Sequence, residues 1–307
     1  MNEKLASLWR RLTQTVLGSE EPSFLLLTGL LANGHVLIQG APGIGKTSLA
    51  HALADSVDCS FKRIQFTPDL LPSDILGYSM FSQADNRFHF IEGPVFSNIV
   101  LADEINRTSP RIQSALLECM NEHQVSIDGI TRPLANPFMV IATQNNLYAS
   151  GTFPLPEPQL DRFLVAITMQ LPDSGTQSQI LELHASGAPS RQVSPVISTA
   201  ELQDIQSAVA AVPVDAKVCR YIIELCDGAR GHQRLGRALS SRAAIAIMRA
   251  AQAVAYMESH AAVHPDDVKR ILKPVLTHRL NIGKLHEESE NEAMASLDEV
   301  MQHTRVP

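Results

Sequence analysis

The segment Gly40–Thr47 has the residue types and spacing of a loop that binds phosphate groups. It reads GAPGIGKT and follows the apolar run Val36–Ile38. Glycines can adopt backbone angles closed to other residues, so that successive N–H groups point at phosphate oxygens. Lys46 would contact the β- and γ-phosphates of ATP, and the Thr47 hydroxyl would bind Mg²⁺. The residues that we expect to hold the nucleotide here are Gly40, Gly43, Ile44, Gly45, Lys46, Thr47 and Ser48.

A second apolar run, Ile99–Ala102, ends in the carboxylates Asp103 and Glu104. Asp103 would bind the nucleotide through Mg²⁺, which it would share with Thr47. Glu104 can act as a general base on the water that attacks the γ-phosphate. Alternatively, the acidic pair only caps the helix that follows. The combination with the glycine-rich loop favours ATP hydrolysis over ATP binding alone.

Three further residues are candidates for catalysis. Asn145 follows the apolar run Phe138–Ala142 and can hold the attacking water or the γ-phosphate, although an Asn at this place is often a turn residue. Arg162 can stabilise the transition state on a neighbouring subunit's nucleotide, as an arginine finger does. Its alternative roles are a salt bridge with Asp161 and a helix-end contact. Arg242 opens a helix of a second domain and can approach the γ-phosphate from that side.

Short apolar runs that alternate with helical patterns predict a parallel sheet with helices on both faces. Ligands bind at the carboxyl ends of the strands in such folds, which is where the polar candidates fall. The expected strands are Val36–Ile38, Phe61–Phe66, Ile99–Ala102, Phe138–Ala142 and Phe163–Ile167.

Two segments interrupt this alternation and predict β-hairpins. Gln124–Ile127 and Ile130–Arg132 flank Asp128-Gly129, which is a strong signal for a two-residue turn. In the other segment, Tyr78–Phe81 can pair with Arg87–Phe90.

The composition of the chain predicts two domains. From Leu171 to Ser198 it is rich in Pro, Ser, Gly and Gln, and the chain beyond is helical in pattern. We expect an α/β core with an N-terminal amphipathic helix (1–175), a hinge region (176–198), a helical lid domain (199–283) and an acidic C-terminal tail (284–307). The expected lid helices are Glu201–Ala211, Val214–Cys226, Ser241–Ser259 and Pro265–Leu276.

Composition restricts the other function classes. The net charge of −7 disfavours a general coat for nucleic acids. The four cysteines have no metal-binding spacing, which is typical of a reduced, cytoplasmic protein. The apolar run Phe24–Ala32 is too short to cross a bilayer. His260 and His264 lie four residues apart with no further ligand evident nearby, so we interpret them as surface histidines.

Five motifs together resemble the MoxR-type AAA+ ATPases: GAPGIGKT, LADEINR (101–107), QSALLECMNEHQVSIDG (113–129), IATQN (141–145) and LPEPQLDRF (155–163). The resemblance covers about residues 35–280. It implies a P-loop domain with a five-stranded parallel sheet, inserted β-hairpins and a small all-α lid. It also implies a homo-oligomeric ring, usually a hexamer, with ATP and Mg²⁺ at the subunit interfaces. By motif, Asp103 and Glu104 correspond to Walker B, Asn145 to sensor 1, Arg162 to the finger acting in trans and Arg242 to sensor 2.

The resemblance also implies a chaperone-like ATPase that remodels or matures a partner protein, often one with a von Willebrand A domain. This chain lacks the Asp-x-Ser-x-Ser motif of that domain, so the partner would be a separate polypeptide. The alternatives are the ATPase subunit of a metal-chelatase-like complex and a DNA-translocating motor. Translocation needs basic hairpins, and neither Tyr78–Gly93 nor Val125–Leu134 is basic, which makes a nucleic-acid partner unfavourable.

Overall fold

A computed structural model of the chain describes residues 3–145, 151–186, 194–235, 239–280 and 287–307. Its central element is a five-stranded parallel sheet with the strand order β10-β1-β9-β6-β3. The predicted α/β fold with a parallel sheet is therefore confirmed. The strands agree with the five that were expected: β1 (His35–Gln39), β3 (Phe61–Gln65), β6 (Ile99–Asp103), β9 (Met139–Gln144) and β10 (Phe163–Thr168).

Helices cover both faces of the sheet, and for this reason the central strands are apolar at nearly every position. Successive strand residues point to opposite faces. Val36 and Ile38 of β1 belong to one hydrophobic cluster, together with α1 (Glu3–Thr15), α2 (Glu20–Leu31) and α3 (Lys46–Ala54). Leu37 belongs to a second cluster, with α4 (Pro72–Leu76), η1 (Pro94–Phe96), α5 (Pro110–Glu122) and α6 (Glu157–Leu160).

The N-terminal amphipathic helix is present as α1. Its residues Leu5, Leu8 and Leu12 are fully buried, which agrees with a packing role. The apolar run Phe24–Ala32 falls mostly in α2, where the residues from Ser23 to Leu31 are all buried. No helix in the described part of the chain is long and apolar enough to cross a membrane.

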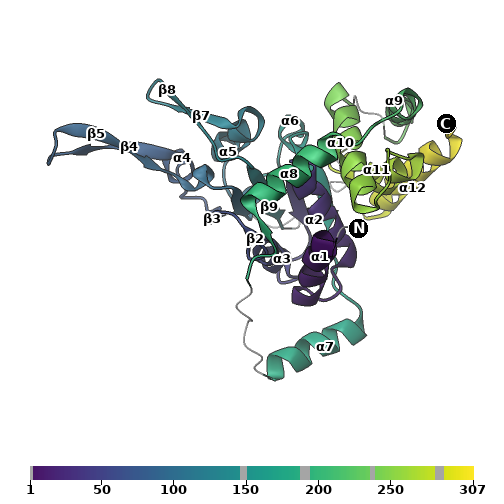
Figure 1. Ribbon diagram of the computed structural model, residues 1–307, viewed down its shortest axis with the longest axis horizontal. Coiled ribbons are helices and arrows are strands. Elements are labelled where there is room, and N and C mark those ends of the chain that lie inside the picture. The colour runs from purple at the N-terminus through teal and green to yellow at the C-terminus, as the bar shows by residue number, and fades with distance from the viewer. Residues whose placement is uncertain (1–2, 146–150, 187–193, 236–238, 281–286) are drawn as a thin grey trace.

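Both predicted hairpins are confirmed, and Figure 1 shows β4–β5 extending away from the body of the molecule. They consist of β4 (Gly77–Ser82) with β5 (Arg87–Glu92), and β7 (Gln124–Ile127) with β8 (Ile130–Pro133). The hairpins contact each other. Ser79 Oγ donates to Asp128 Oδ2 at 2.6 Å, and the Arg132 guanidinium lies 3.9 Å from the centre of the Phe90 ring.

The predicted hinge region (176–198) contains most of α7 (Ser174–Ala185), which begins two residues earlier, and β11 (Ile197–Ser198), which pairs with β2 (Val57–Asp58). Its residues 187–193 lie outside the described part of the chain. The helices beyond it are α8 (Thr199–Ala210), α9 (Ala216–Gly231), α10 (Ser241–Met257), α11 (Pro265–Leu276) and α12 (Glu287–His303).

The predicted acidic tail contains a packed helix. Residues 284–286 lie outside the described part of the chain, and α12 follows them. Leu297 of α12 is fully buried, and the helix contacts α9 and α11. The acidic residues of the tail therefore belong to a helix whose apolar side packs against α9 and α11.

His35 joins three elements at the start of β1. Its ring is buried, with Nε2 3.0 Å from Met120 O of α5, and Nδ1 accepts a hydrogen bond from Val140 N of β9 at 3.0 Å. Because Nδ1 must accept, the neutral ring is the form that fits. Burial lowers the pKa of His35 from 6.5 to about 4.

We predict a loss of stability on mild acidification that depends on His35. The unfolded chain binds the imidazole proton more tightly, so the stability present above pH 6.5 decreases as the pH falls toward 4. The difference in pKa corresponds to about 3 kcal/mol. Urea unfolding at several pH values measures this slope. His35→Asn keeps an acceptor for Val140, and we expect it to flatten the slope. An unchanged slope in that variant would contradict the assignment.

Candidate nucleotide site

The loop between β1 and α3 has the backbone that phosphate binding needs. Gly43 has φ +79°, and a Cβ added there would meet no atom within 4 Å, so the loop is open at this point. At Gly40, a Cβ would come within 2.5 Å of Met169 O, because the loop passes close to the segment after β10. The loop leads into the N-terminus of α3, whose free N–H groups and dipole attract anions.

Lys46, the first residue of α3, is buried and points back into the loop. Its Nζ donates to Gly40 O at 2.8 Å, to Ala41 O at 2.7 Å and to Asn145 Oδ1 at 2.8 Å. Burial lowers the pKa of Lys46, and the negative charges of Asp103 and Glu104 oppose this effect. The ammonium group therefore lies between its own loop and two carboxylates.

Asp103, at the end of β6, is a nearly buried carboxylate shared by three donors. Thr47 Oγ1 lies 3.3 Å from both carboxylate oxygens. Arg63 donates to Oδ2 from Nη2 at 2.7 Å and from Nε at 3.1 Å, and Thr143 Oγ1 donates to Oδ1 at 2.5 Å. The Thr47 hydroxyl and this carboxylate are thus adjacent oxygen ligands of the kind that Mg²⁺ prefers.

Glu104 adopts the left-handed conformation, with φ 57° and ψ 47°. This conformation is uncommon for a side chain of this type, and such residues often occur at functional sites. Its N–H donates to Thr143 Oγ1 at 2.9 Å. Oε2 accepts from Gln65 Nε2 at 3.2 Å and from Arg107 Nη1 at 3.1 Å. The alternative that the acidic pair caps the helix that follows has no support, because the N-cap residue of α5 is Ser109. The Glu104 side chain does not cap the short η2 (Ile105–Arg107) either.

Asn145, after the end of β9, connects the two halves of the site. Its Oδ1 accepts from Lys46 Nζ at 2.8 Å, and its Nδ2 donates to Glu104 Oε1 at 2.6 Å. β9 lies between β1 and β6 in the sheet, so the residue that follows it reaches the groups at the ends of both neighbours. The amide is thus used on both sides, and it does more than form a turn.

A cavity of about 1200 Å³ opens beside the glycine-rich loop. Gly43, Gly45 and Ser48 line it on one side, and Val16–Ser19, between α1 and α2, line it on another. This volume is ample for a nucleoside, and the cavity borders the loop that leads into Lys46. The residues present therefore fit ATP with Mg²⁺. The side chain of Ile44 is buried beneath the loop.

Arg162 lies apart from this cluster. Nη1 donates to the carbonyl oxygen of Leu117 on α5, and its buried Nε has no acceptor among the described residues. Burial lowers the pKa of Arg162, and the charge of Arg242 lowers it further. The alternative of a salt bridge with Asp161 is wrong, because the carboxylate of Asp161 pairs with Arg279 instead, at 2.9 Å.

Arg242 is exposed in the first turn of α10, close enough to Arg162 for their charges to interact. Among the described residues, neither arginine forms a hydrogen bond or ion pair with Lys46, Asp103 or Asn145. The predicted site residues therefore form two groups, one around the glycine-rich loop and one pair of arginines elsewhere.

Four residues that contact Asp103 or Glu104 were not predicted from the sequence: Arg63, Gln65, Arg107 and Thr143. Arg63 and Gln65 lie two residues apart on β3, so their side chains point to the same face of the sheet. Gln65 pairs with Asp103 on the neighbouring strand β6. The spacing of two along a strand that ends at the same edge as β6 was the available signal. Thr143, two residues before Asn145, carries the same signal.

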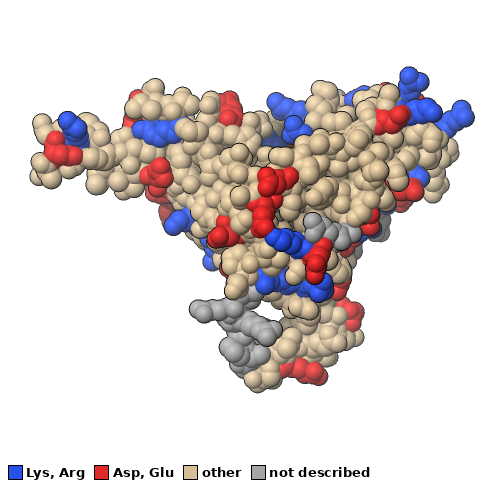
Figure 2. Space-filling view, viewed as in Figure 1, with Lys and Arg blue, Asp and Glu red and all other residues tan. Residues whose placement is uncertain are grey.

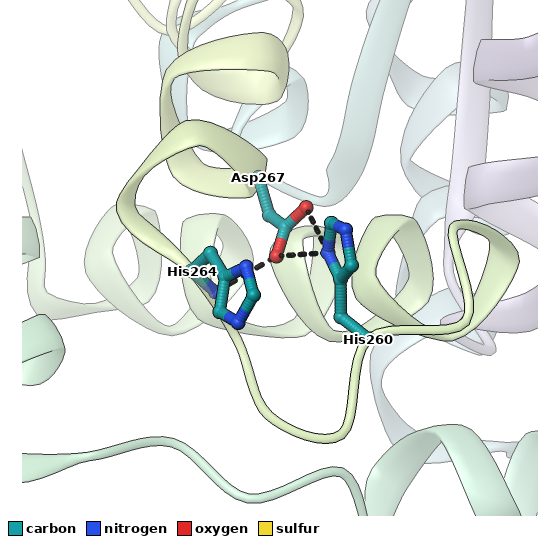
Figure 3. A group of neighbouring side chains, drawn as sticks. All are labelled: His260, His264 and Asp267. Carbon is teal, nitrogen blue, oxygen red and sulfur yellow. Dashed lines mark hydrogen bonds and ion pairs between the residues drawn. The ribbon is translucent and has the colours of Figure 1, made fainter.

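A separate cluster contains His260, His264 and Asp267 (Figure 3). The two rings stack with their centres 4.4 Å apart, and the ligand atoms lie within 4.8 Å of one another, so the expectation that no further ligand is nearby was wrong. Asp267 Oδ2 accepts from the N–H of His264 at 2.8 Å, and Oδ1 lies 3.0 Å from His260 Nδ1. The buried carboxylate is therefore already bonded as part of the N-terminal cap of α11.

Comparisons with known families and structures agree with this geometry. Residues 35–165 match the ATPase family associated with various cellular activities (AAA), and residues 228–300 match the AAA lid domain. The crystal structure of a putative ATPase from Cytophaga hutchinsonii is similar, with a TM-score of 0.87 and 35% sequence identity. The alignment covers 99% of this chain and 95% of that one.

Several similar sequences share the name MoxR. Chaperone MoxR1 from Mycobacterium tuberculosis is 38% identical over 274 residues, which are 86% of this chain and 72% of that protein. Protein MoxR from Paracoccus denitrificans is 31% identical over 309 residues, with 90% and 88% covered. The protein YeaC from Bacillus subtilis is 43% identical over 299 residues, with 96% and 92% covered.

The glycine-rich loop yields a prediction with a matched control. Gly43 and Gly129 both have positive φ, and a Cβ added at either position would meet open space. Alanine at either position should destabilise the fold by about 1 kcal/mol. Gly43→Ala should also weaken ATP binding about tenfold or more, because relaxation of the strained backbone turns the loop N–H groups away. Calorimetric titration with ATP tests this, and equal affinities for the two variants would contradict it.

Proposed function

Because this chain belongs to the MoxR family of AAA+ ATPases, we propose that it couples ATP hydrolysis to the remodelling or maturation of a partner protein. The observation that carries the proposal is the Asn145 amide, which bonds to Lys46 on one side and to Glu104 on the other. A phosphate-binding lysine and a candidate base are thereby fixed in one place. The name of the relative Chaperone MoxR1 supports the chaperone-like part of the proposal.

We assign the hydrolytic roles as follows. The N–H groups of the loop and Lys46 would hold the phosphates of ATP. Thr47 and Asp103 would hold Mg²⁺, which would neutralise phosphate charge. Glu104 would accept a proton from the attacking water, and Asn145 would orient that water or the γ-phosphate. The fixed carboxylate of Glu104, with three hydrogen-bond donors around it, supports its role as the base.

We propose that the site is shared between subunits. Arg162 and Arg242 lie apart from Lys46 in the same chain, yet their charges interact and Arg162 Nε lacks an acceptor among the described residues. An anion bound to another copy of the chain would neutralise the two arginines and accept a hydrogen bond from Arg162 Nε. The proposal therefore includes a homo-oligomeric ring, with six subunits as the expected number, in which the arginine pair of one subunit contacts the nucleotide of the next.

The hairpins support a protein client. Exposed apolar side chains lie along β4 and β5, namely Tyr78, Met80, Phe81, Phe88 and Ile91. Figure 2 shows charges of both signs on this arm and no continuous basic stripe on the visible face. Tracking along DNA phosphates would require such a stripe. We propose a separate protein with a von Willebrand A domain as the partner.

The four cysteines are free thiols, which fits the cytoplasm as the proposed location. We keep the expected division of labour, in which residues 1–175 bind and cleave ATP, 176–198 serve as a hinge and 199–283 act as a lid. The match of residues 228–300 to AAA lid domains supports the last assignment.

Substitution of the candidate base gives the first test. We expect Glu104→Gln to bind ATP normally and to hydrolyse it at least about a hundred times more slowly. A general base contributes about this factor to the rate of hydrolysis. Glu258→Gln, at an exposed carboxylate after α10, is the control and should be unchanged. Phosphate release under saturating ATP measures both. Normal turnover by Glu104→Gln would remove Glu104 from the mechanism.

A second test concerns the client. Turnover is measured with the chain alone, with single-stranded DNA and with a co-purified protein that has a von Willebrand A domain. We expect stimulation by the protein and none by DNA. Phe88→Ser, at the most exposed aromatic of the β4–β5 arm, should reduce the stimulation while basal turnover stays the same. Stimulation by DNA alone would favour a translocating motor instead.

A further inference from the structure

The carboxylate of Asp161, directly before Arg162, is held by two segments of the C-terminal helical part. Arg279, which follows α11, donates from Nε to Oδ1 at 2.9 Å, and Ser240 Oγ donates to Oδ2 at 3.2 Å. Ser240 is the N-cap residue of α10, the helix that carries Arg242. Asp161 is therefore the point where both segments meet the residue before the candidate finger.

The Arg279 guanidinium is buried and fully bonded between the start of β10 and the end of α11. Its side chain is 4% exposed. Nη1 donates to Leu164 O at 3.1 Å and to Val275 O at 2.5 Å, and Nη2 donates to Phe163 O at 2.8 Å and to Asp161 O at 3.3 Å. Burial lowers the pKa of Arg279, and the charge of Asp161 opposes this. A buried guanidinium needs its carboxylate partner, so the pair fixes the start of β10 against the end of α11.

Arg162 has the opposite surroundings. Among the described residues it forms no ion pair, and its Nε lacks an acceptor. The nearby carboxylates Glu118 and Glu122 on α5 act on it only through space, as does the positive charge of Arg242. The carboxylate of the adjacent Asp161 is bonded to Arg279 and Ser240 instead.

We propose that the Asp161–Arg279 ion pair is a positioning device for the two arginines of the shared site. It keeps the Asp161 carboxylate away from Arg162 and fixes the start of β10 relative to α10, so that both guanidinium groups face an anion together. That anion is the terminal phosphate of the nucleotide on the neighbouring subunit. Arg279 itself touches no nucleotide. The inference rests on the proposed shared site.

Mixed assemblies of full-length chains test the proposal. One chain carries Glu104→Gln, so it offers its arginines to a neighbour and hydrolyses nothing at its own site. The other carries Arg162→Ala, so it keeps a complete loop and base but lacks the finger. Each is inactive alone, and mixing them should restore turnover at the interfaces where the first chain serves the second. Arg279→Lys, which keeps the charge and loses the planar fork, is then added to one chain at a time.

We expect an asymmetric result. Arg279→Lys in the finger-donating chain should lower the restored turnover about tenfold through kcat, with KM for ATP little changed, because small misplacements of catalytic groups have effects of this size or larger. In the chain that supplies the loop, the same substitution should change turnover less than about twofold. If Arg279→Lys acted only by destabilising the helical lid, it would lower turnover equally from either chain.

Arg270→Lys is the matched control. Arg270 also connects α11 to the core, through Glu21 at 2.9 Å and the ring of Phe24 at 4.1 Å, but its side chain is 45% exposed. We expect no change in restored turnover from either chain. If Arg279→Lys fails to fold, Asp161→Asn takes its place, because it removes the carboxylate charge and retains an acceptor oxygen.

The outcomes separate the two proposals. If the mixture of Glu104→Gln and Arg162→Ala chains stays inactive although light scattering shows that they assemble together, the shared site itself is wrong. If mixing restores turnover but Arg279→Lys has no effect, or an equal effect from both chains, the positioning role is wrong and the shared site stands. The same readings apply to Asp161→Asn.

Discussion

The site depends on the order of strands in the parallel sheet. With β9 between β1 and β6, the carboxyl ends of three strands lie side by side, and one amide, that of Asn145, reaches both Lys46 and Glu104. Because β9 separates β1 from β6, their ends lie two strand spacings apart, roughly 10 Å, and the Asn145 amide bridges this gap. The apolar character of the strands follows from the same arrangement, since helices cover both faces.

This constraint also explains the tight network of charges around the site. Asp103 and Glu104 are adjacent in sequence, but the left-handed backbone at Glu104 separates their surroundings. Asp103 contacts Thr47, Arg63 and Thr143, whereas Glu104 contacts Gln65, Arg107 and Asn145. Asp103 thus lies beside the Thr47 hydroxyl, an oxygen ligand suited to Mg²⁺, whereas Glu104 is held by three donors and stays partly exposed.

The sequence allowed the sheet, both hairpins and the lid helices to be predicted, because buried parallel strands and two-residue turns have local patterns. It also indicated which residues end the strands. Partner choice was not predictable: Asp161 precedes Arg162, yet its partner Arg279 lies more than a hundred residues away. That contact depends on tertiary packing, which has no signature in local spacing. The contacts of Asp267 with His264 and of Arg63 with Asp103 did have local signals, namely the helix-cap position three residues after His264 and the spacing of two along β3.

The central claim is that two subunits are needed for one complete catalytic site. The most direct measurement is ATP turnover per subunit over a dilution series, with the mass of the assembly recorded by light scattering in the same samples. We predict that turnover falls in proportion to the loss of assembled subunits, because the monomer keeps its loop and base but loses the arginines of its neighbour. Undiminished turnover by a monomer would contradict the account.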